Sequence, residues 1–295
     1  MRTYPYPAGD TPVKWISTDW LKDQLDNEDI IILDVQPNVH DYIMGHIPHA
    51  IYMNEGLLRS AWEGLPAVYV PPESIQPVLS RAGLETDVPV VVYSGSGRYS
   101  KCTRGLGDGL EQPMMAYSLL RYGLRQVYIL DGGIDKWKND GGELTKVYPI
   151  CQRSDFPVRV RKDFFIEYRE FKKTKDDPEV IVFDARPAEF YKESKLWPKS
   201  GHIPGAINLP WRDFMTEENS TLLKPDEEIR EIVAKTGLTQ DKMVYIYCGT
   251  GREATNEFLI LKWYIGHDKV KIYEGSFTEW AAHLGNPTVT GENPL

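Results

Sequence analysis

Short apolar runs recur along the chain and predict buried β-strands. Three such runs lie in each half of the sequence, at 30–35, 90–94, 127–130, 180–185, 243–248 and 270–274. They are rich in valine and isoleucine and show little polar alternation, which is the pattern of strands covered on both faces. We therefore expect a parallel sheet in each half of the chain.

Helical patterns separate these runs. PESIQPVLSRAG (72–83) and DEEIREIVAKTG (226–237) each end at a glycine, and EATNEFLILKWYIG (253–266) follows a strand directly. Alternation of strand and helix predicts an α/β fold in which helices flank both faces of each sheet. The first half also carries a glycine-rich stretch, residues 105–113, without a counterpart in the second half, and we expect it to form a loop.

The two halves are related by an internal repeat. Asp34 and Asp184 each end an apolar run, and each is followed by a proline three positions on and then by Gly-His-Ile-Pro. YSGSGR (93–98) matches YCGTGR (247–252), and a block that ends in tryptophan follows in both halves. The blocks keep their order, so the repeat indicates a duplicated domain.

The length of the repeat sets the expected domain boundaries. We expect a first domain at residues 1–145, a linker at 146–160 and a second domain at 161–295, because residues 145–162 show no period and contain two prolines. His46 and His202, in the Gly-His-Ile-Pro blocks, are expected to fix the turn in which they lie.

Composition narrows the classes of function. The 34 basic and 43 acidic residues give a net charge of −9, which argues against a nucleic-acid partner. No apolar stretch is long enough to span a membrane, so we expect no membrane partner. The start of the chain lacks the apolar core of a signal peptide, which favours a cytoplasmic protein; a periplasmic protein that has lost its leader would begin in the same way.

Cysteine usage directs attention to one residue. Cys102, Cys151 and Cys248 form no Cys-x-x-Cys pair, so neither a disulfide framework nor a cysteine-rich zinc site is expected. We also expect that the protein requires no metal or organic cofactor. Cys248 ends a predicted strand and is followed by Gly-Thr-Gly-Arg-Glu and a predicted helix. Ligands of open α/β sheets bind at such strand ends.

The loop after Cys248 predicts a reactive thiol. Gly249 and Gly251 allow a tight curl whose N–H groups, from Gly249 to Glu253, point inward and favour an anion. A cysteine at a helix start can have a pKa as low as about 3.5–7.5, so we expect a thiolate at pH 7. Ser94 takes this position in the first half, and a serine without an evident base is a poor nucleophile. We therefore expect one active site per chain.

These motifs together resemble the two-domain rhodanese-type sulfurtransferases over roughly residues 12–290. The resemblance rests on the tandem Gly-His-Ile-Pro blocks, the Cys-Gly-Thr-Gly loop and the closing acidic-Gly-Gly/Ser-x-x-x-Trp block. It implies that Cys248 takes a sulfane sulfur from a small anionic donor, thiosulfate or 3-mercaptopyruvate, and passes it from a persulfide to cyanide, a thiol or a protein. We expect the active site for this sulfur transfer to include the loop residues Gly249, Thr250, Gly251 and Glu253.

Two arginines are candidates for binding the donor. Arg186 occupies the position where the resemblance implies a substrate-binding arginine, although an ion pair with Asp184 or Glu189 would also explain it. Arg252 lies in the loop, where it is either a donor ligand or a solvated charge at the helix start. Thr250 is expected either to bind the donor through its hydroxyl or only to form the turn.

The loop sequence leaves the donor open. Cys-Gly-Thr-Gly is similar to the mercaptopyruvate type, whereas Arg252 and Glu253 match neither type; thiosulfate is the first expectation and 3-mercaptopyruvate the second. A persulfide carrier that docks on a partner protein is the alternative function. A phosphatase is disfavoured because Ala254 stands where a Cys-x5-Arg loop needs arginine. A dinucleotide site at Gly249–Ala254 with Glu274 is disfavoured because too few residues follow to complete it.

Overall fold

The computed structural model describes residues 2–96 and 107–295. The first of its two five-stranded parallel sheets has the order β1-β7-β6-β2-β3, and the second has the order β10-β9-β11-β12-β8. The strands of the first sheet are β1 (Val13–Ile16), β2 (Ile31–Asp34), β3 (Ile51–Tyr52), β6 (Val90–Tyr93) and β7 (Val127–Leu130). Those of the second are β8 (Phe165–Ile166), β9 (Val180–Asp184), β10 (Ile207–Asn208), β11 (Met243–Tyr247) and β12 (Val270–Tyr273). This confirms the predicted α/β fold.

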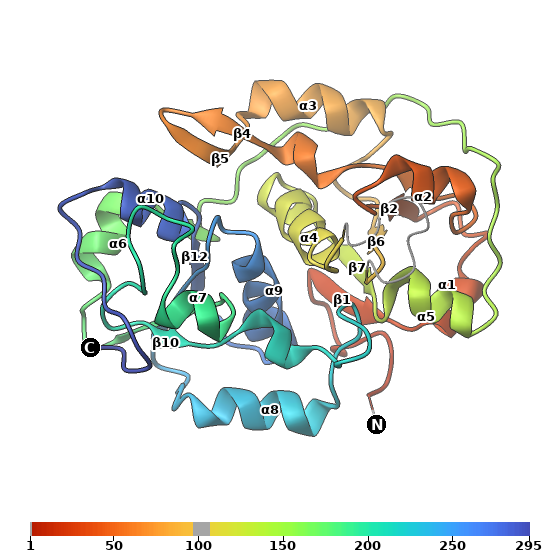
Figure 1. Cartoon of the computed structure of the whole chain (residues 1–295). Helices are drawn as coiled ribbons and strands as arrows, with labels where there is room; N and C mark the ends of the chain where they lie inside the picture. Colours follow the sequence, from red (N-terminus) through yellow and green to blue (C-terminus); the bar gives the residue numbers. More distant parts are fainter. Residues whose placement is uncertain (1, 97–106) are drawn as a thin grey trace. The chain divides into compact units, whose positions relative to one another are not determined.

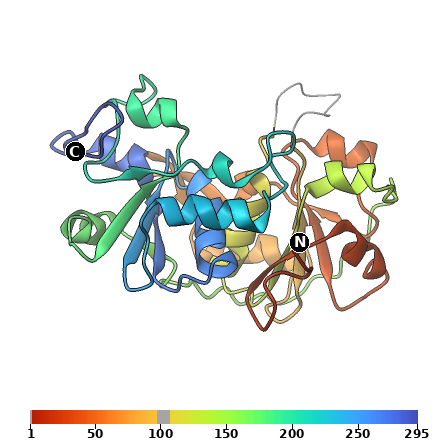
Figure 2. The same ribbon diagram turned by 90° about the horizontal axis from the view of Figure 1, so that it is seen from below.

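Helices cover both faces of each sheet (Figure 1). In the first half they are α1 (Thr18–Asp23), α2 (Val39–Met44), α3 (Pro72–Arg81), α4 (Glu111–Arg121) and α5 (Gly133–Asn139), with a 3-10 turn η1 (Glu55–Leu58). In the second half they are α6 (Tyr168–Thr174), α7 (Ala188–Lys192), α8 (Asp226–Lys235), α9 (Glu253–Leu259), a π-helical turn η3 (Ile260–Tyr264) and α10 (Ser276–Ala282), with a 3-10 turn η2 (Trp211–Phe214). Figures 1 and 2 show α8 and α9 on one face of the second sheet and α6 and α10 on the other.

The chain folds into two compact units that do not follow a single cut in the sequence. Unit 1 comprises Met1–Ser60, Tyr69–Arg161 and Met215–Leu223, and unit 2 comprises Ala61–Val68, Lys162–Phe214 and Lys224–Leu295. Each unit therefore contains a short segment from the other half of the sequence. The segment given to unit 2 belongs to a hairpin of β4 (Arg59–Trp62) and β5 (Leu65–Tyr69).

Residues 146–160, the expected linker, contain no helix or strand and pack on unit 1. The Arg159 amide donates to the Tyr122 carbonyl at 2.9 Å, and the Ser154 amide donates to the Ser80 carbonyl at 2.9 Å. Phe156 is fully buried. The segment is thus part of the first unit's structure and not a free tether.

Several elements differ from their predicted limits. The edge strands of both sheets were not predicted from the sequence. They are β1 and β3 in the first sheet and β8 and β10 in the second, and all but β1 are only two residues long. The predicted loop at 105–113 is wrong at its end, because α4 begins at Glu111 and continues through Pro113; proline is tolerated in a helix's first turn, where its missing N–H would have no partner. Residues 105 and 106 lie outside the described part of the chain.

The helix predicted at 253–266 changes type within its length. It is α-helical over Glu253–Leu259 and π-helical over Ile260–Tyr264. Within residues 2–96 and 107–295, every helix is too short or too polar to cross a lipid bilayer.

Candidate active site

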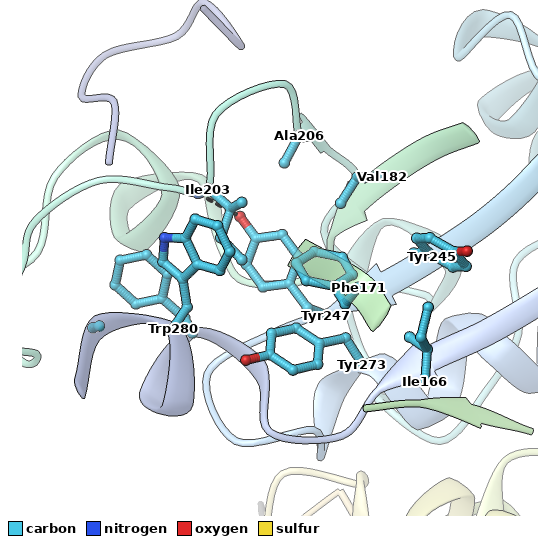
Figure 3. Close-up of a cluster of buried hydrophobic side chains, with 11 residues drawn as sticks. Ile166, Phe171, Val182, Ile203, Ala206, Tyr245, Tyr247, Tyr273 and Trp280 are labelled. Atoms are coloured by element: carbon cyan, nitrogen blue, oxygen red, sulfur yellow. Dashed lines mark hydrogen bonds between the residues drawn. The ribbon is translucent and has the colours of Figure 1, made fainter. Parts of the chain in front are cut away.

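Strand β11 places Cys248 at the carboxyl end of the central strand of unit 2. Tyr247, the last residue of the strand, points into a buried cluster with Phe171 and Trp280 (Figure 3). Because side chains alternate along a strand, Cys248 points to the opposite face, where α9 packs. The Ile203 amide donates to the Tyr247 hydroxyl at 3.0 Å, so the Gly-His-Ile-Pro block fixes the residue next to the cysteine.

The imidazole of His202 holds the turn that carries this block. Its Nδ1 lies 3.0 Å from the Tyr191 carbonyl, its Nε2 lies 3.2 Å from the Asn293 carbonyl, and its ring stacks on Tyr191. His46 makes the same kind of contacts in unit 1, with Tyr42 and Val147. The prediction that these histidines are structural is confirmed.

The loop after Cys248 requires glycine at two positions. Gly251 has a φ of +85°, and a Cβ there would lie 2.8 Å from the carbonyl oxygen of Glu274. A Cβ on Gly249 would lie 2.8 Å from the indole ring of Trp197. Any larger side chain would therefore strain the loop or displace its neighbours.

Backbone amides converge on the sulfur of Cys248. The Gly251 amide donates to Sγ at 3.1 Å, and the amides of Thr250 and Ala254 act to lower the pKa of the thiol. The cysteine's own amide donates to the Ser276 hydroxyl at 3.2 Å. Thr250 and Gly251 fall within the predicted range of donors, Gly249 to Glu253, and Ala254 lies one residue beyond it.

The ionisation state of the thiol differs from the prediction. Cys248 is fully buried, and burial together with the adjacent Glu253 carboxylate raises the pKa of its thiol well above the usual value, against the effect of the amides. The prediction of a thiolate at pH 7 is therefore wrong for the resting protein. Desolvation penalises the charged form, and the sequence did not reveal how completely the sulfur is covered.

Arg186 lies beside the cysteine in a buried ion pair. Its Nε donates to Asp184 at 2.9 Å, and its Nη2 donates to the Gly201 carbonyl at 2.9 Å. The guanidinium is fully buried, with its central carbon 4.1 Å from the ring centre of Phe277. The structure thus shows the ion pair with Asp184 that the sequence analysis held as the alternative. The remaining nitrogen, Nη1, has no hydrogen-bond partner within the described residues.

The other predicted site residues surround the sulfur at the same strand end. Thr250, Arg252 and Glu253 are half-buried, and Arg252 occupies the position before the first turn of α9. A small cavity next to Thr250 is lined by Leu65–Val68 of the hairpin segment and by Gly275 and Thr278. The hairpin segment therefore packs beside the loop that follows Cys248, at Thr250.

Trp197 is a site residue that the sequence analysis missed. Its ring covers Gly249, its Nε1 donates to the Thr278 hydroxyl at 2.9 Å, and the Arg186 guanidinium lies 5.1 Å from its ring centre. Trp197 belongs to residues 193–200, which lengthen the second Asp-to-Gly-His-Ile-Pro interval relative to the first. That difference in length is the signal that could have identified it.

The matching loop in unit 1 carries a serine that has no base beside it in the described structure. Ser94 is fully buried, and its Oγ has no hydrogen-bond partner among described residues. Of the other cysteines, Cys151 is half-buried, and burial raises the pKa of its thiol. Cys102 lies outside the described residues.

Comparison with known proteins agrees with this architecture. The family model described as "Rhodanese-like domain" matches residues 17–140 and 167–283. A relative from Synechococcus elongatus named "Putative thiosulfate sulfurtransferase" is 33% identical over 282 residues, covering 93% of this chain and 85% of the relative. The "Sulfur carrier protein TtuD" of Thermus thermophilus is 27% identical over 295 residues, covering 95% of this chain and 98% of that protein.

A solved structure gives the same relationship. The crystal structure of SseA from Escherichia coli, described as showing the "Rhodanese" fold and catalytic mechanism of 3-mercaptopyruvate sulfotransferases, superposes with a TM-score of 0.75. It is 26% identical and covers 89% of this chain and 98% of that one. With both halves matched by the same domain model, the chain belongs to the rhodanese-like family and carries two rhodanese-like domains in tandem.

Proposed function

We propose that this protein is a sulfurtransferase that carries a sulfane sulfur as a persulfide on Cys248. The observation that supports this most directly is the Gly251 amide that donates to the cysteine sulfur, together with the Thr250 and Ala254 amides that lower the pKa of the thiol. Such donors stabilise a negative charge that develops on sulfur during the reaction, and they do so without reorganisation. The names of the relatives in the family point to the same chemistry.

The proposed cycle has two half-reactions. The Cys248 sulfur attacks the outer sulfur of the donor, an S–S bond forms, and the bond between that sulfur and the rest of the donor breaks with its electron pair leaving on the donor. An acceptor nucleophile then attacks the outer sulfur of the persulfide, and the electron pair of the S–S bond returns to Cys248. No net oxidant or reductant is consumed.

We propose a small anionic donor, with thiosulfate first and 3-mercaptopyruvate second, and cyanide or a thiol as the acceptor. The names of the relatives support both donors. The donor ligands proposed are the loop amides, Thr250 and Arg252, with Nη1 of Arg186 as a further N–H donor beside the sulfur.

Two alternatives to a sulfurtransferase lose support in the fold. A dinucleotide site leaves the cysteine at the end of β11 without a role, although the Gly251 amide donates to its sulfur. A phosphatase loop needs six positions from cysteine to arginine, and Ala254 occupies the sixth.

A protein persulfide carrier is the second candidate function. The relative named as a sulfur carrier protein supports it, because it matches nearly the whole chain. Slow turnover with small donors together with fast transfer to a protein thiol would favour this function over a small-molecule enzyme.

Replacement of the nucleophile tests the proposal. Incubation of the wild type with thiosulfate or 3-mercaptopyruvate should add one sulfur atom to its intact mass, and cyanide should remove it. Cys248→Ser should abolish both the mass gain and thiocyanate formation, because a serine hydroxyl is a much weaker nucleophile. Cys151→Ser and Cys102→Ser are the matched controls and should retain activity. A Cys248→Ser variant that still transferred sulfur would contradict the proposal.

A further inference from the structure

Among the ionisable side chains, Glu253 has the largest effect on the pKa of the Cys248 thiol. It is the first residue of α9, and its carboxylate lies close enough to the sulfur to raise the pKa of the Cys248 thiol. Its Oε2 lies 3.9 Å from the position that a Cβ on Gly249 would take, so the carboxylate rests against the catalytic loop. A carboxylate at this place would repel an anionic donor, which calls for a compensating role.

The other groups around the sulfur are either neutral or already engaged. Ser276 from α10 offers only a hydroxyl, and the hairpin residues Leu65–Val68 that line the cavity at Thr250 are uncharged. Tyr247 is held neutral, because burial raises the pKa of its hydroxyl well above the usual value. The charge of Arg186 faces the carboxylate of Asp184.

Glu257, one turn further along α9, adds no charge behind Glu253. It is fully buried, and neither carboxyl oxygen has a hydrogen-bond partner within the described residues. Burial, with the nearby carboxylates of Asp184, Asp213 and Glu253, raises the pKa of Glu257 well above its usual value. Glu257 is therefore neutral, which leaves Glu253 as the negative charge that acts on the thiol from α9.

We propose that Glu253 is an acid–base catalytic residue, which takes the proton from Cys248 and delivers it to the leaving group of the sulfur donor. The inference rests on the proposed function and deepens it. It reconciles a protonated resting thiol with a loop of amides built to receive negative charge, because the thiolate then exists only while it attacks.

The step balances with a β-mercapto-α-keto acid as donor. The Cys248 S–H bond breaks and its proton moves to Glu253, while the sulfur attacks the donor sulfur and an S–S bond forms. The C–S bond of the donor breaks, and its electron pair forms the enolate of the product. Glu253 returns its proton to the enolate carbon, which gives the keto acid, a Cys248 persulfide that keeps the donor thiol's proton, and the carboxylate again.

Thiosulfate makes a weaker demand on the same residue. Its leaving group is sulfite, which departs as a stable anion and needs no proton, so Glu253 can act only as the base in that reaction. The carboxylate also repels this doubly negative donor. Loss of the acid–base group should therefore harm the two donors unequally.

Single-turnover persulfide formation tests the inference. For Glu253→Gln at pH 7 we expect the rate with 3-mercaptopyruvate to fall by about 100-fold or more, the range of a lost acid–base group. With thiosulfate the loss should be at least about tenfold smaller, because only the base is lost and the repulsion is relieved. Glu253→Asp, which keeps a carboxylate, should recover part of the loss with 3-mercaptopyruvate.

The controls separate catalysis from structure. Glu227→Gln removes an exposed carboxylate from the first turn of α8, also in unit 2, and should leave both rates unchanged. Equal losses with both donors, no recovery in Glu253→Asp, or a rate with 3-mercaptopyruvate close to that of the wild type would each overturn the acid–base role. A wild type that formed a persulfide with neither donor would overturn the proposed function as well.

Discussion

The two halves of the chain differ in the residues that pair with the buried aspartate at the end of β2 or of β9. Asp184 is paired with the Arg186 guanidinium, whereas the equivalent Asp34 receives neutral donors: the Gln36 side-chain amide at 3.0 Å and the Tyr93 hydroxyl at 2.7 Å. Burial raises the pKa of Asp34 to about 6, although these hydrogen bonds oppose the increase. Unit 1, which has Ser94 at the position of Cys248, thus keeps the carboxylate but lacks its charged partner.

This difference predicts a pH-dependent stability of unit 1. Because the pKa of Asp34 is higher in the folded than in the unfolded state, the folded state takes up a proton first as the pH falls through about 6. The free energy of unfolding of the wild type should therefore rise relative to Asp34→Asn, by up to about 3 kcal/mol between pH 7 and pH 4. Hydrogen exchange of the Val91 and Val92 amides in β6 reports on this unit.

An exposed carboxylate provides the comparison for that measurement. Asp29→Asn, which removes an exposed carboxylate from the same unit, is the control variant and is measured over the same range. A difference between Asp34→Asn and the wild type that stayed constant with pH would mean that Asp34 titrates alike in both states.

The sequence was sufficient to predict a main-chain donor at the Cys248 sulfur but not the ionisation state of the thiol. A strand end followed by Gly-x-Gly and a helix start is a local pattern, and the Gly251 amide within it does donate to the sulfur. The pKa of Cys248 depends on burial and on where the Glu253 side chain points, which are properties of packing. The ion pair of Arg186 was readable as one of two alternatives, because its partner is only two positions away.

At the scale of elements, the strands that were predicted are those buried on both faces. The central strands, such as β6 and β11, give uninterrupted apolar runs. The edge strands β3 and β10 are only two residues long and half-buried, so they leave no periodic pattern to detect. The π-helical turn after Leu259 is only five residues long, so its different periodicity cannot be detected in the sequence.

The segment at 193–200 places Trp197 against Gly249, the residue that follows Cys248. Trp197 covers Gly249, so we expect Trp197→Ala to speed alkylation of Cys248 by iodoacetamide by about tenfold or more, since a partly buried aromatic cover would be removed. Intact mass against time measures this rate.

A second tryptophan in unit 2 serves as the matched control. Trp263 is also half-buried, and it packs on Phe164 and Phe258 at another part of the unit. Trp263→Ala should affect stability without the same gain in alkylation. If both variants alkylate at the same rate, the gain reflects general loosening, and Trp197 is not a specific cover.

At the scale of the whole molecule, each unit includes a short segment from the other half of the sequence. Leu65–Val68 line the cavity beside Thr250 in unit 2. In unit 1, the Asn219 side chain donates to the Gly132 carbonyl at 2.9 Å, and the Gly132 amide donates to the Thr221 carbonyl at 2.9 Å. The repeat predicts two similar domains, but this exchange arises from long-range packing that no local pattern encodes.

Because Ala61–Val68 belongs to unit 2, we expect this segment of the first half to be needed for the reaction at Cys248 in the second half. Replacing Ala61–Val68 by Asn-Gly should preserve unit 1, because a two-residue turn of this type can join Ser60 to Tyr69 as a hairpin. The kcat/KM for the small donors should fall by at least about tenfold, because Thr250, a proposed donor ligand, loses the hairpin residues that pack beside it. The reciprocal replacement of residues 217–219 by Gly-Gly-Ser removes the Asn219 hydrogen bond to Gly132 in unit 1 and should leave kcat/KM within about threefold of the wild type. Equal losses in both variants would attribute the effect to stability, whereas loss only in the first would assign the hairpin to the site of Cys248.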